Sequence, residues 1–541
     1  MKFKTTYFSI LKITILLFVV SGTSVAQQIS YYQNQEYNPF YKTVYQPGNN
    51  FHTSVQPFRI DKINAIANVD SLIYDGIRKP SGDLNFWRRI FKDHLLKWED
   101  KDISIRVNPL FDFEVGNEMD ESLQTWTNTR GLFIEGNIGK YFYFYTDFLE
   151  NQAVFPNYYN DFVFERKVVP GQGKTRSKGE RTHDYGQSTG FISFNPIKWF
   201  NVQLGQGKNF IGDGYRSLLL SDNSYSYPYL KFSAEFKKVH YMVMWGQHRD
   251  LFNIDPADES RDMRYPTKYS ASHYLTVNIG KRWSVGLFES VVWAAQDAAG
   301  DRNFDWAYMN PFIFYRPVEY SIGSPDNITM GANIKYLVGQ HNVLYGQFVM
   351  GEFKSDEVFS GNKWWANKQG FQLGMKCFNL FGINNLYFQA EYNQVRPYTY
   401  SHRETISNYA HYNQELAHPL GANFREGVSF LRYKYKRWHF NLEFMAAMKG
   451  KDFSDEVSYG GNIFLDNDTR PNEYGNTIGQ GLKTNLQYLD GNISYMINPR
   501  NNFNIALGAR YRKESNDVET QNTQMVWFAV RTSLKNLYRD F

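Results

Sequence analysis

Alternation of apolar and polar residues dominates the chain from Ile103 onward and predicts β-strands. Successive side chains of a strand point to opposite faces, so such a segment presents one apolar and one polar face. Segments of about ten residues suit strands that cross a membrane at a tilt. About 18 such segments lie near 103–115, 126–138, 141–150, 184–195, 199–208, 228–237, 239–248, 270–280, 283–293, 328–339, 343–352, 369–378, 385–394, 427–435, 438–447, 483–496, 503–513 and 525–534.

The connections between these segments alternate between short and long. Short ones include Gly139-Lys140 and Lys436-Arg437. Long ones lie near 116–125, 151–183, 209–227, 249–269, 294–327, 353–368, 395–426, 448–482 and 514–524. Short turns on one rim and long loops on the other are typical of outer-membrane barrels. The pattern predicts an all-β fold, an antiparallel outer-membrane β-barrel over residues 101–541 with loops plugging the lumen.

The first residues predict export. Met1-Lys2-Phe3-Lys4 is basic, an apolar run follows from Ile10 to Val20, and the stretch ends in small residues at Ala26. This is the pattern of a secretory signal peptide over residues 1–26. Together with the strand pattern it predicts a multi-pass barrel in the outer membrane of a Gram-negative cell.

Residues 27–100 differ from the rest and predict a small periplasmic helical segment. Ser81 to Asp83 can cap a helix, and apolar residues then recur at helical spacing; they are Leu84, Trp87, Ile90, Phe91, Leu95 and Trp98. The helix can cap the periplasmic end of the barrel with its apolar face. Alternatively, it can lie on the inner leaflet or bind a partner protein.

Composition agrees with a membrane barrel. The chain has 40 Tyr, 44 Phe and 40 Gly, and aromatic residues form girdles at both interfaces of such barrels. Cys377 is the only cysteine, so no intramolecular disulfide stabilises the fold. The net charge of +5 is small and no nucleic-acid-binding module is present, so we expect no nucleic-acid partner. Expected partners are outer-membrane lipid, lipopolysaccharide and the barrel-assembly machinery, which usually reads a terminal aromatic such as Phe541.

The connection within Leu204–Phe232 is unusual because it holds three consecutive leucines, Leu218-Leu219-Leu220. A surface loop does not normally need such a run, so this loop is expected to fold into the lumen and help to close it. Its polar residues either fix that plug or contact a ligand; they are Tyr215, Arg216, Asp222 and Asn223.

Other motifs give weak chemical signals. His402, His411 and His418 share one long loop, but without the tight spacing of a zinc site. Asp466-Asn467-Asp468 lacks the glycine and distal glutamate of a calcium loop. Ser217, Ser221, Asp222 and His183 contain the groups of a hydrolase triad, but nothing in the sequence brings them together. We expect no metal, no cofactor and no enzymatic activity.

Several segments in order resemble the Wzi-type capsule-assembly proteins of Bacteroidota. They are Asn128-Thr129-Arg130-Gly131, Glu150-Asn151-Gln152, the stretch Gly212 to Asn223, Tyr308-Met309-Asn310-Pro311 with Arg316 and Glu319, Arg396-Pro397-Tyr398-Thr399-Tyr400, and His418 to Asn423. One departure is Met350-Gly351-Glu352-Phe353, where the pattern calls for Asp before Glu. The resemblance implies an 18-stranded barrel with a periplasmic helical cap, closed to free diffusion.

The resemblance also implies a lectin-like role in holding capsular or other exopolysaccharide at the cell surface. Relatives labelled gliding-motility protein RemB supply an alternative role in surface adhesion and motility, with surface-motility or secretion proteins as partners. A channel or porin is a further alternative. Loop aromatic and polar residues can form the sugar-binding surface or plug the barrel; the residues predicted to bind ligand are Tyr215, Arg216, Asp222, Asn223, Trp306, Arg316, Glu319, Arg396, Tyr398, Tyr400 and His418.

Overall fold

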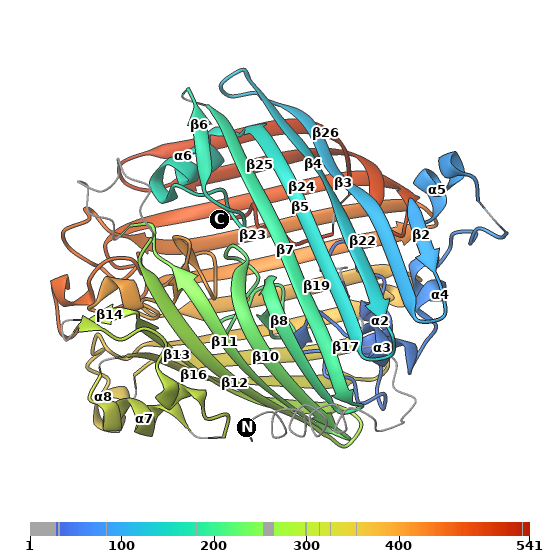
Figure 1. Cartoon of the computed structure of the whole chain (residues 1–541). Helices are drawn as coiled ribbons and strands as arrows, with labels where there is room; N and C mark the ends of the chain where they lie inside the picture. Colours follow the sequence, from blue (N-terminus) through green and yellow to red (C-terminus); the bar gives the residue numbers. More distant parts are fainter. Residues whose placement is uncertain are drawn as a thin grey trace, which may run out of the picture.

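The computed structural model describes residues 29–30, 33–82, 84–179, 181–252, 265–297, 300–312, 314–324, 326–352, 354–532 and 534–541. The predicted signal peptide lies outside these residues. Eighteen strands of the described chain form one closed barrel (Figure 1). They are β3 (Ile103–Glu118), β4 (Leu123–Ile138), β5 (Phe142–Val154), β7 (Thr182–Ile197), β8 (Phe200–Gly207), β10 (Tyr227–Phe236), β11 (Val239–Arg249), β12 (Thr267–Ile279), β13 (Trp283–Ala294), β16 (Asn327–Val338), β17 (Asn342–Met350), β18 (Gln369–Phe378), β19 (Leu386–Val395), β22 (Phe424–Tyr435), β23 (Trp438–Lys451), β24 (Leu482–Asn498), β25 (Phe503–Ser515) and β26 (Thr520–Thr532).

Each strand pairs antiparallel with its neighbours, and β26 closes the ring on β3 through pairs such as Phe528↔Val115. The predicted barrel and all of its predicted strands are confirmed. Two connections predicted to be long are tight turns, at 119–122 and 516–519. The strands on either side continue as polar ribbons beyond the apolar band, which shortens those connections.

The outer face of the barrel is apolar, as a lipid-facing surface must be. Leu204, Leu373 and Leu507 are each more than three-fifths exposed on strands. Exposed aromatic residues gather where strands meet the short turns; they include Phe142, Trp199, Phe236, Trp283, Tyr435 and Trp438. These residues form an aromatic girdle at the short-turn rim.

No helix in the described ranges is long and apolar enough to cross a membrane. The helices are short; they are α2 (Tyr41–Val44), α3 (Ile60–Asn64), α4 (Val69–Ile73), α5 (Phe86–Lys92), α6 (Asn157–Arg166), α7 (Tyr315–Ile322) and α8 (Ser355–Phe359), with single 3₁₀ turns η2 (Trp306–Met309), η3 (Leu380–Gly382), η4 (Thr405–Ser407) and η5 (Asn467–Thr469).

The helix predicted from Leu84 to Trp98 is shorter than expected. It spans only α5, capped by Asn85, and Leu95 lies after its end. Residues 96–99 form β2 (Leu96–Glu99), which pairs with β3 at Leu96↔Val107. Strand β26 pairs with β3 only as far as Arg531↔Asp112, so the edge of β3 beyond that point needs another partner. Strand β2 covers this edge, which explains why strand pairing overrides the helical spacing.

Four segments enter the lumen and fill much of it. Buried residues of the N-terminal segment, such as Phe40 and Tyr45, pack with inward residues of the barrel wall near the short-turn rim. The loop between β8 and β10 and the loop between β19 and β22 fill the middle, and residues 534–541, called the tail here, fold back inside after β26. Figure 1 marks the C-terminal residue within the outline of the barrel. The remaining short strands are β1 (Val55–Gln56), β6 (Thr175–Lys178), β9 (Phe210–Ile211), β14 (Gln296–Asp297), β15 (Gly300–Asp301), β20 (Ala410–His411) and β21 (Gln414–Glu415).

Candidate functional site

The three leucines of the loop between β8 and β10 lie inside the barrel, as predicted. Leu218 and Leu219 are fully buried, and Leu220 is 3% exposed. Tyrosines of the loop between β19 and β22 hold the leucine backbone: Tyr400 Oη donates to Leu218 O at 2.7 Å, and Tyr409 Oη donates to Leu219 O at 2.8 Å. Two long loops therefore interlock to form a central plug.

A buried charge network fixes this plug to the barrel wall. Arg216 Nη2 lies 2.8 Å from Glu426 Oε1 on β22 and 2.7 Å from Asp540 Oδ2 in the tail. His418 Nε2 lies 2.9 Å from Glu426 Oε2. Burial opposes the charge of Arg216, but Asp540 and Glu426 more than offset it and raise its pKa well above the usual range. The network joins the central loop, the wall and the tail.

The two glycines of Gly212-Asp213-Gly214 allow close contact with the wall. A Cβ at Gly214 would lie 2.4 Å from Glu391 Oε2, so only glycine fits here. Glu391 accepts hydrogen bonds from the backbone N–H groups of Tyr215 and Arg216. Between the glycines, Asp213 faces the N-terminal segment and accepts a hydrogen bond from Thr53 Oγ1 at 2.5 Å.

The polar residues Asp222 and Asn223 also hold the plug. Asp222 accepts a hydrogen bond from Tyr538 Oη at 2.6 Å and another from Asn536 Nδ2 at 3.0 Å. Asn223 Nδ2 donates to Glu415 O at 3.1 Å. Lys208 Nζ donates to the carbonyls of Gly171 and Asp222, and burial lowers its pKa to about 8.

A cavity of about 910 Å³ lies at the long-loop rim, above the plug, and is called the mouth cavity here. Its volume lies within the range of roughly 300–1,000 Å³ that ligand pockets occupy. Its lining combines the rings of Tyr158, Phe162 and Phe541 with many charged and amide groups, which include Asp161, Lys449, Lys451, Arg512, Glu514 and Gln521.

The aromatic part of the mouth cavity comes from α6 and the tail. The ring centroids of Phe162 and Phe541 are 4.8 Å apart, and Phe541 also packs on Tyr158. Arg512 lies over the Tyr158 ring, 4.6 Å from its centroid. The polar groups around these rings are already oriented: Gln521 Nε2 donates to Asp161 Oδ2 at 2.9 Å. An aromatic patch beside fixed polar groups can bind a molecule that is apolar on one face and polar at its edge.

The predicted ligand residues divide into three places. Tyr215, Arg216, Asp222, Asn223, Tyr400 and His418 meet in the central plug, where all are buried. Arg396 and Tyr398 bind neighbouring loops, since Arg396 Nε donates to Asn367 O and Tyr398 Oη donates to Ser458 O. The plug role of the first group was one of the two predicted alternatives, and the contacts of these residues within the plug support it.

The other three predicted residues lie at η2 and α7, apart from the plug. Trp306 is 76% exposed. Arg316 pairs with Glu319 at 3.1 Å and lies 3.9 Å from Glu352. Glu352 belongs to the segment where the sequence departs from the Wzi-type pattern. Its pairing with Arg316 places it on an outer loop, away from the network around Arg216.

The groups considered for a hydrolase triad have separate partners. Ser217 Oγ donates to Ile211 O, and Ser221 Oγ donates to Ala417 O. His183 Nε2 lies 2.7 Å from Asn160 Oδ1 on α6. Among the described residues, no group of three or more His, Cys, Asp or Glu side chains is arranged to hold a metal ion.

Sequence reasoning missed the mouth cavity and the tail. The rings of Phe162 and Phe541 are separated by 378 intervening residues, and no local pattern joins them. One signal was present: the alternation of β26 stops near Leu534, and Arg539 is polar where a strand would need an apolar residue. That break marks the point where the chain leaves the wall for the lumen.

No family model matches the chain, and no curated protein matches it in sequence. Among solved structures, the chain is similar to Wzi of Escherichia coli, described as an outer-membrane protein involved in group 1 capsule assembly and a carbohydrate-binding β-barrel. The TM-score is 0.54 at 11% identity, covering 94% of this chain and 100% of Wzi. OpdK of Pseudomonas aeruginosa gives a TM-score of 0.42 at 9% identity, covering 79% of this chain and 98% of that chain. The likeness to Wzi shows the fold, an outer-membrane β-barrel.

Proposed function

We propose that this barrel binds and retains capsular or other exopolysaccharide at the cell surface through the mouth cavity, without catalysis. The observation that carries the proposal is the aromatic pair Phe162 and Phe541, set among charged and amide groups in a cavity of about 910 Å³. The cavity opens at the long-loop rim, which faces outward in barrels of this type.

The chemistry of the cavity suits a glycan. The apolar face of a sugar ring stacks on an aromatic ring, and its hydroxyl groups need directed donors and acceptors. Asp161 and Gln521 already bond each other and hold such groups beside the rings. The lining holds both basic and acidic side chains, and Lys451 and Arg512 both pair with Glu514, so the charged groups offer hydrogen bonds to hydroxyl groups and the cavity carries no excess of positive charge.

Two further observations support the proposal. Wzi, which shares the fold, is described as a carbohydrate-binding barrel involved in capsule assembly. The central plug also suits a retention role, because a protein that holds a polymer at the surface does not need an open lumen. Leu218 and Leu219 are fully buried in that plug.

Deletion of the gene tests the proposal in cells. We expect polysaccharide to move from the cell-bound fraction to the medium while total polysaccharide stays normal. Expression of the wild-type protein or of Phe164→Ala should restore retention, whereas Phe162→Ala should restore it only in part. Phe164 is a matched control because it lies on the same helix but outside the cavity lining. Unchanged cell-bound polysaccharide in the deletion strain contradicts the proposal, and a defect only in spreading on agar favours a motility role.

A further inference from the structure

Three cavities follow one another along the inner face of the wall formed by β22–β26. Along β24 alone, Leu486 lines the mouth cavity, Asp490 lines an interior cavity, and Met496 lines a cavity at the short-turn rim. The interior cavity has a volume of about 200 Å³ and the rim cavity about 540 Å³. These two share four lining residues, which are Gln35, Glu36, Arg432 and Asn441. Cavities therefore line the inner face of this wall from the short-turn rim to the long-loop rim.

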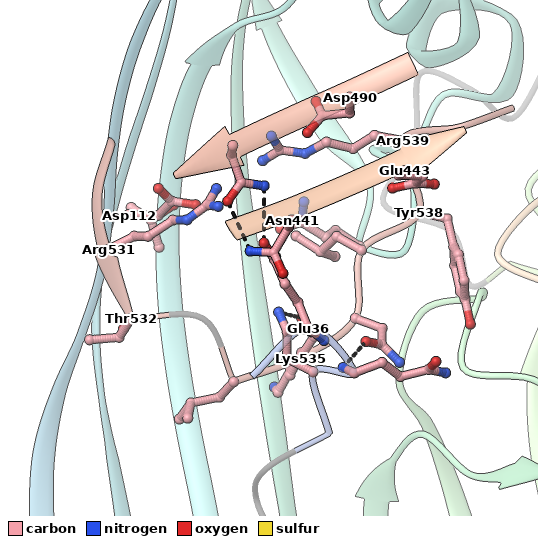
Figure 2. Close-up of a pocket in the computed structure, with 18 of the residues that line it drawn as sticks. Glu36, Asp112, Asn441, Glu443, Asp490, Arg531, Thr532, Lys535, Tyr538 and Arg539 are labelled. Atoms are coloured by element: carbon pink, nitrogen blue, oxygen red, sulfur yellow. Dashed lines mark hydrogen bonds between the residues drawn. The ribbon is translucent and has the colours of Figure 1, made fainter. Parts of the chain in front are cut away.

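The interior cavity is polar, and Figure 2 shows its charged groups arranged around it. Several of its buried polar atoms have no hydrogen-bond partner among the described residues. The acceptors are Gln35 Oε1 and Asp112 Oδ1, and the donors are Gln187 Nε2, Trp527 Nε1 and Arg531 Nε. Buried polar groups normally have partners, so these atoms must bind water or a polar solute.

The balance of these atoms indicates the kind of solute. Two are acceptors and three are donors, so the cavity selects neither a simple anion nor a simple cation. A hydroxyl group can both donate and accept a hydrogen bond. Rings such as Tyr488 and Trp527 add flat apolar surface to the same cavity. A small, uncharged, hydroxyl-rich solute matches this lining.

The tail separates the interior cavity from the mouth cavity. Residues 534–539 line the interior cavity and Phe541 lines the mouth cavity. Side chains of the wall and of α6 hold this segment: Arg539 Nη1 lies 3.2 Å from Glu114 Oε2, and Tyr158 Oη donates to Arg539 O at 3.0 Å. Arg512 Nε donates to Phe541 O at 3.0 Å. Residues 534–541 contain no helix or strand, so side-chain contacts keep the segment in place, and these include the Arg216–Asp540 ion pair and the Tyr538–Asp222 hydrogen bond.

We propose that the β22–β26 wall forms a closed path for small, uncharged, hydroxyl-rich solutes, and that the tail is its displaceable stopper. The path begins at the short-turn rim, passes the interior cavity beside Asn492, and ends below Phe541. Displacement of residues 538–541 breaks the Arg216–Asp540 ion pair and the Tyr538–Asp222 hydrogen bond, and it joins the interior cavity to the mouth cavity. The proposal does not depend on polysaccharide retention, because access of a small solute to the interior cavity can be measured without any glycan.

Access of a thiol reagent to single cysteines tests the path. In a Cys377→Ala background, Asn492→Cys reports on the interior cavity, Thr484→Cys on the mouth cavity, and Leu489→Cys on the lipid-facing side of the same strand. The probe is an uncharged, sugar-sized maleimide, added to intact cells from outside or to opened cells from both sides. We expect Thr484→Cys to react from outside, and Asn492→Cys to react only in opened cells.

Loosening the tail should then admit the probe from outside. Phe541→Ala, and separately Tyr158→Phe, should raise the outside labelling rate of Asn492→Cys by roughly tenfold, the scale expected when a tethering contact is lost. The rate at Leu489→Cys should not change, and folding is verified by the heat-dependent gel mobility of the barrel. Tyr158→Phe removes only one hydroxyl group, so it remains informative if Phe541→Ala does not assemble. The proposal is overturned if Asn492→Cys stays unreactive in opened cells. It is also overturned if Phe541→Ala and Tyr158→Phe leave the labelling rate of Asn492→Cys in intact cells unchanged.

Discussion

Arg216 Nη2 lies 2.7 Å from Asp540 Oδ2, which joins the central loop to a residue 324 positions further along the chain. The same guanidinium binds Glu426 on the barrel wall. Both acidic partners are at most 1% exposed. One arginine therefore holds three separate parts of the molecule together in the lumen.

Loss of this guanidinium should destabilise the barrel strongly. Arg216→Met leaves Glu426 and Asp540 buried without their cation, and removal of one partner of a buried ion pair costs about 3–5 kcal/mol. We expect the free energy of unfolding, measured in lipid vesicles with urea, to fall by about that amount. The triple variant Arg216→Met, Glu426→Gln, Asp540→Asn removes the unpaired charges and should recover much of the loss. If Arg216→Met unfolds like the wild type, the network does not hold the plug.

The leucine run makes a prediction about packing. Leu219 is fully buried, and Leu219→Ala leaves a cavity in the plug, which costs about 2–5 kcal/mol. Leu204 is 62% exposed on the lipid-facing side of β8, so Leu204→Ala is the matched control and should cost less. Unfolding in lipid vesicles measures both changes. Equal losses for the two variants would argue that the plug adds no packing stability.

Burial of Lys208 should make the free energy of unfolding depend on pH. Burial lowers its pKa to about 8, whereas a lysine in the unfolded chain has a pKa of about 10.4. Between these values the unfolded state binds more protons than the folded state, so stability should rise with pH from about 8 to about 10.4. The difference in unfolding free energy between the wild type and Lys208→Met isolates this contribution. A difference that stays flat across that pH range shows that Lys208 is not desolvated in the folded state.

The wall of the barrel was predictable from sequence because lipid imposes a period of two on every strand. Leu204 and Leu373 show this pattern, since the lipid-facing side chain must be apolar wherever it lies in the chain. Residues that face the lumen obey no such rule. Arg216 and Glu426 are an inward cation and anion whose pairing depends on how two distant segments fold inside the barrel. The leucine run predicted that this loop forms a plug, but the residues that the plug contacts in the barrel wall and the tail could not be predicted.

The helix predicted over residues 84–98 shows how tertiary pairing overrides local spacing. Leu95 and Trp98 have helical spacing with Phe91, yet Trp98 pairs with Ile105 as part of β2. The edge of β3 that β2 covers is left without β26 as a partner because β26 ends at Thr532. That cause lies more than 400 residues away in sequence, so no local pattern could reveal it.

Direct binding of glycan to the purified barrel tests the central claim of retention at the mouth cavity. Fragments of the surface polysaccharide from the same cells are titrated into wild type, Phe162→Ala and Phe164→Ala in detergent, with heat of binding as the readout. Loss of an aromatic contact worth about 0.5–1.5 kcal/mol predicts an affinity about two- to tenfold weaker for Phe162→Ala. Phe164→Ala should bind like the wild type. The absence of saturable binding to the wild type, or equal affinities for all three proteins, would contradict the mouth cavity as the polysaccharide site.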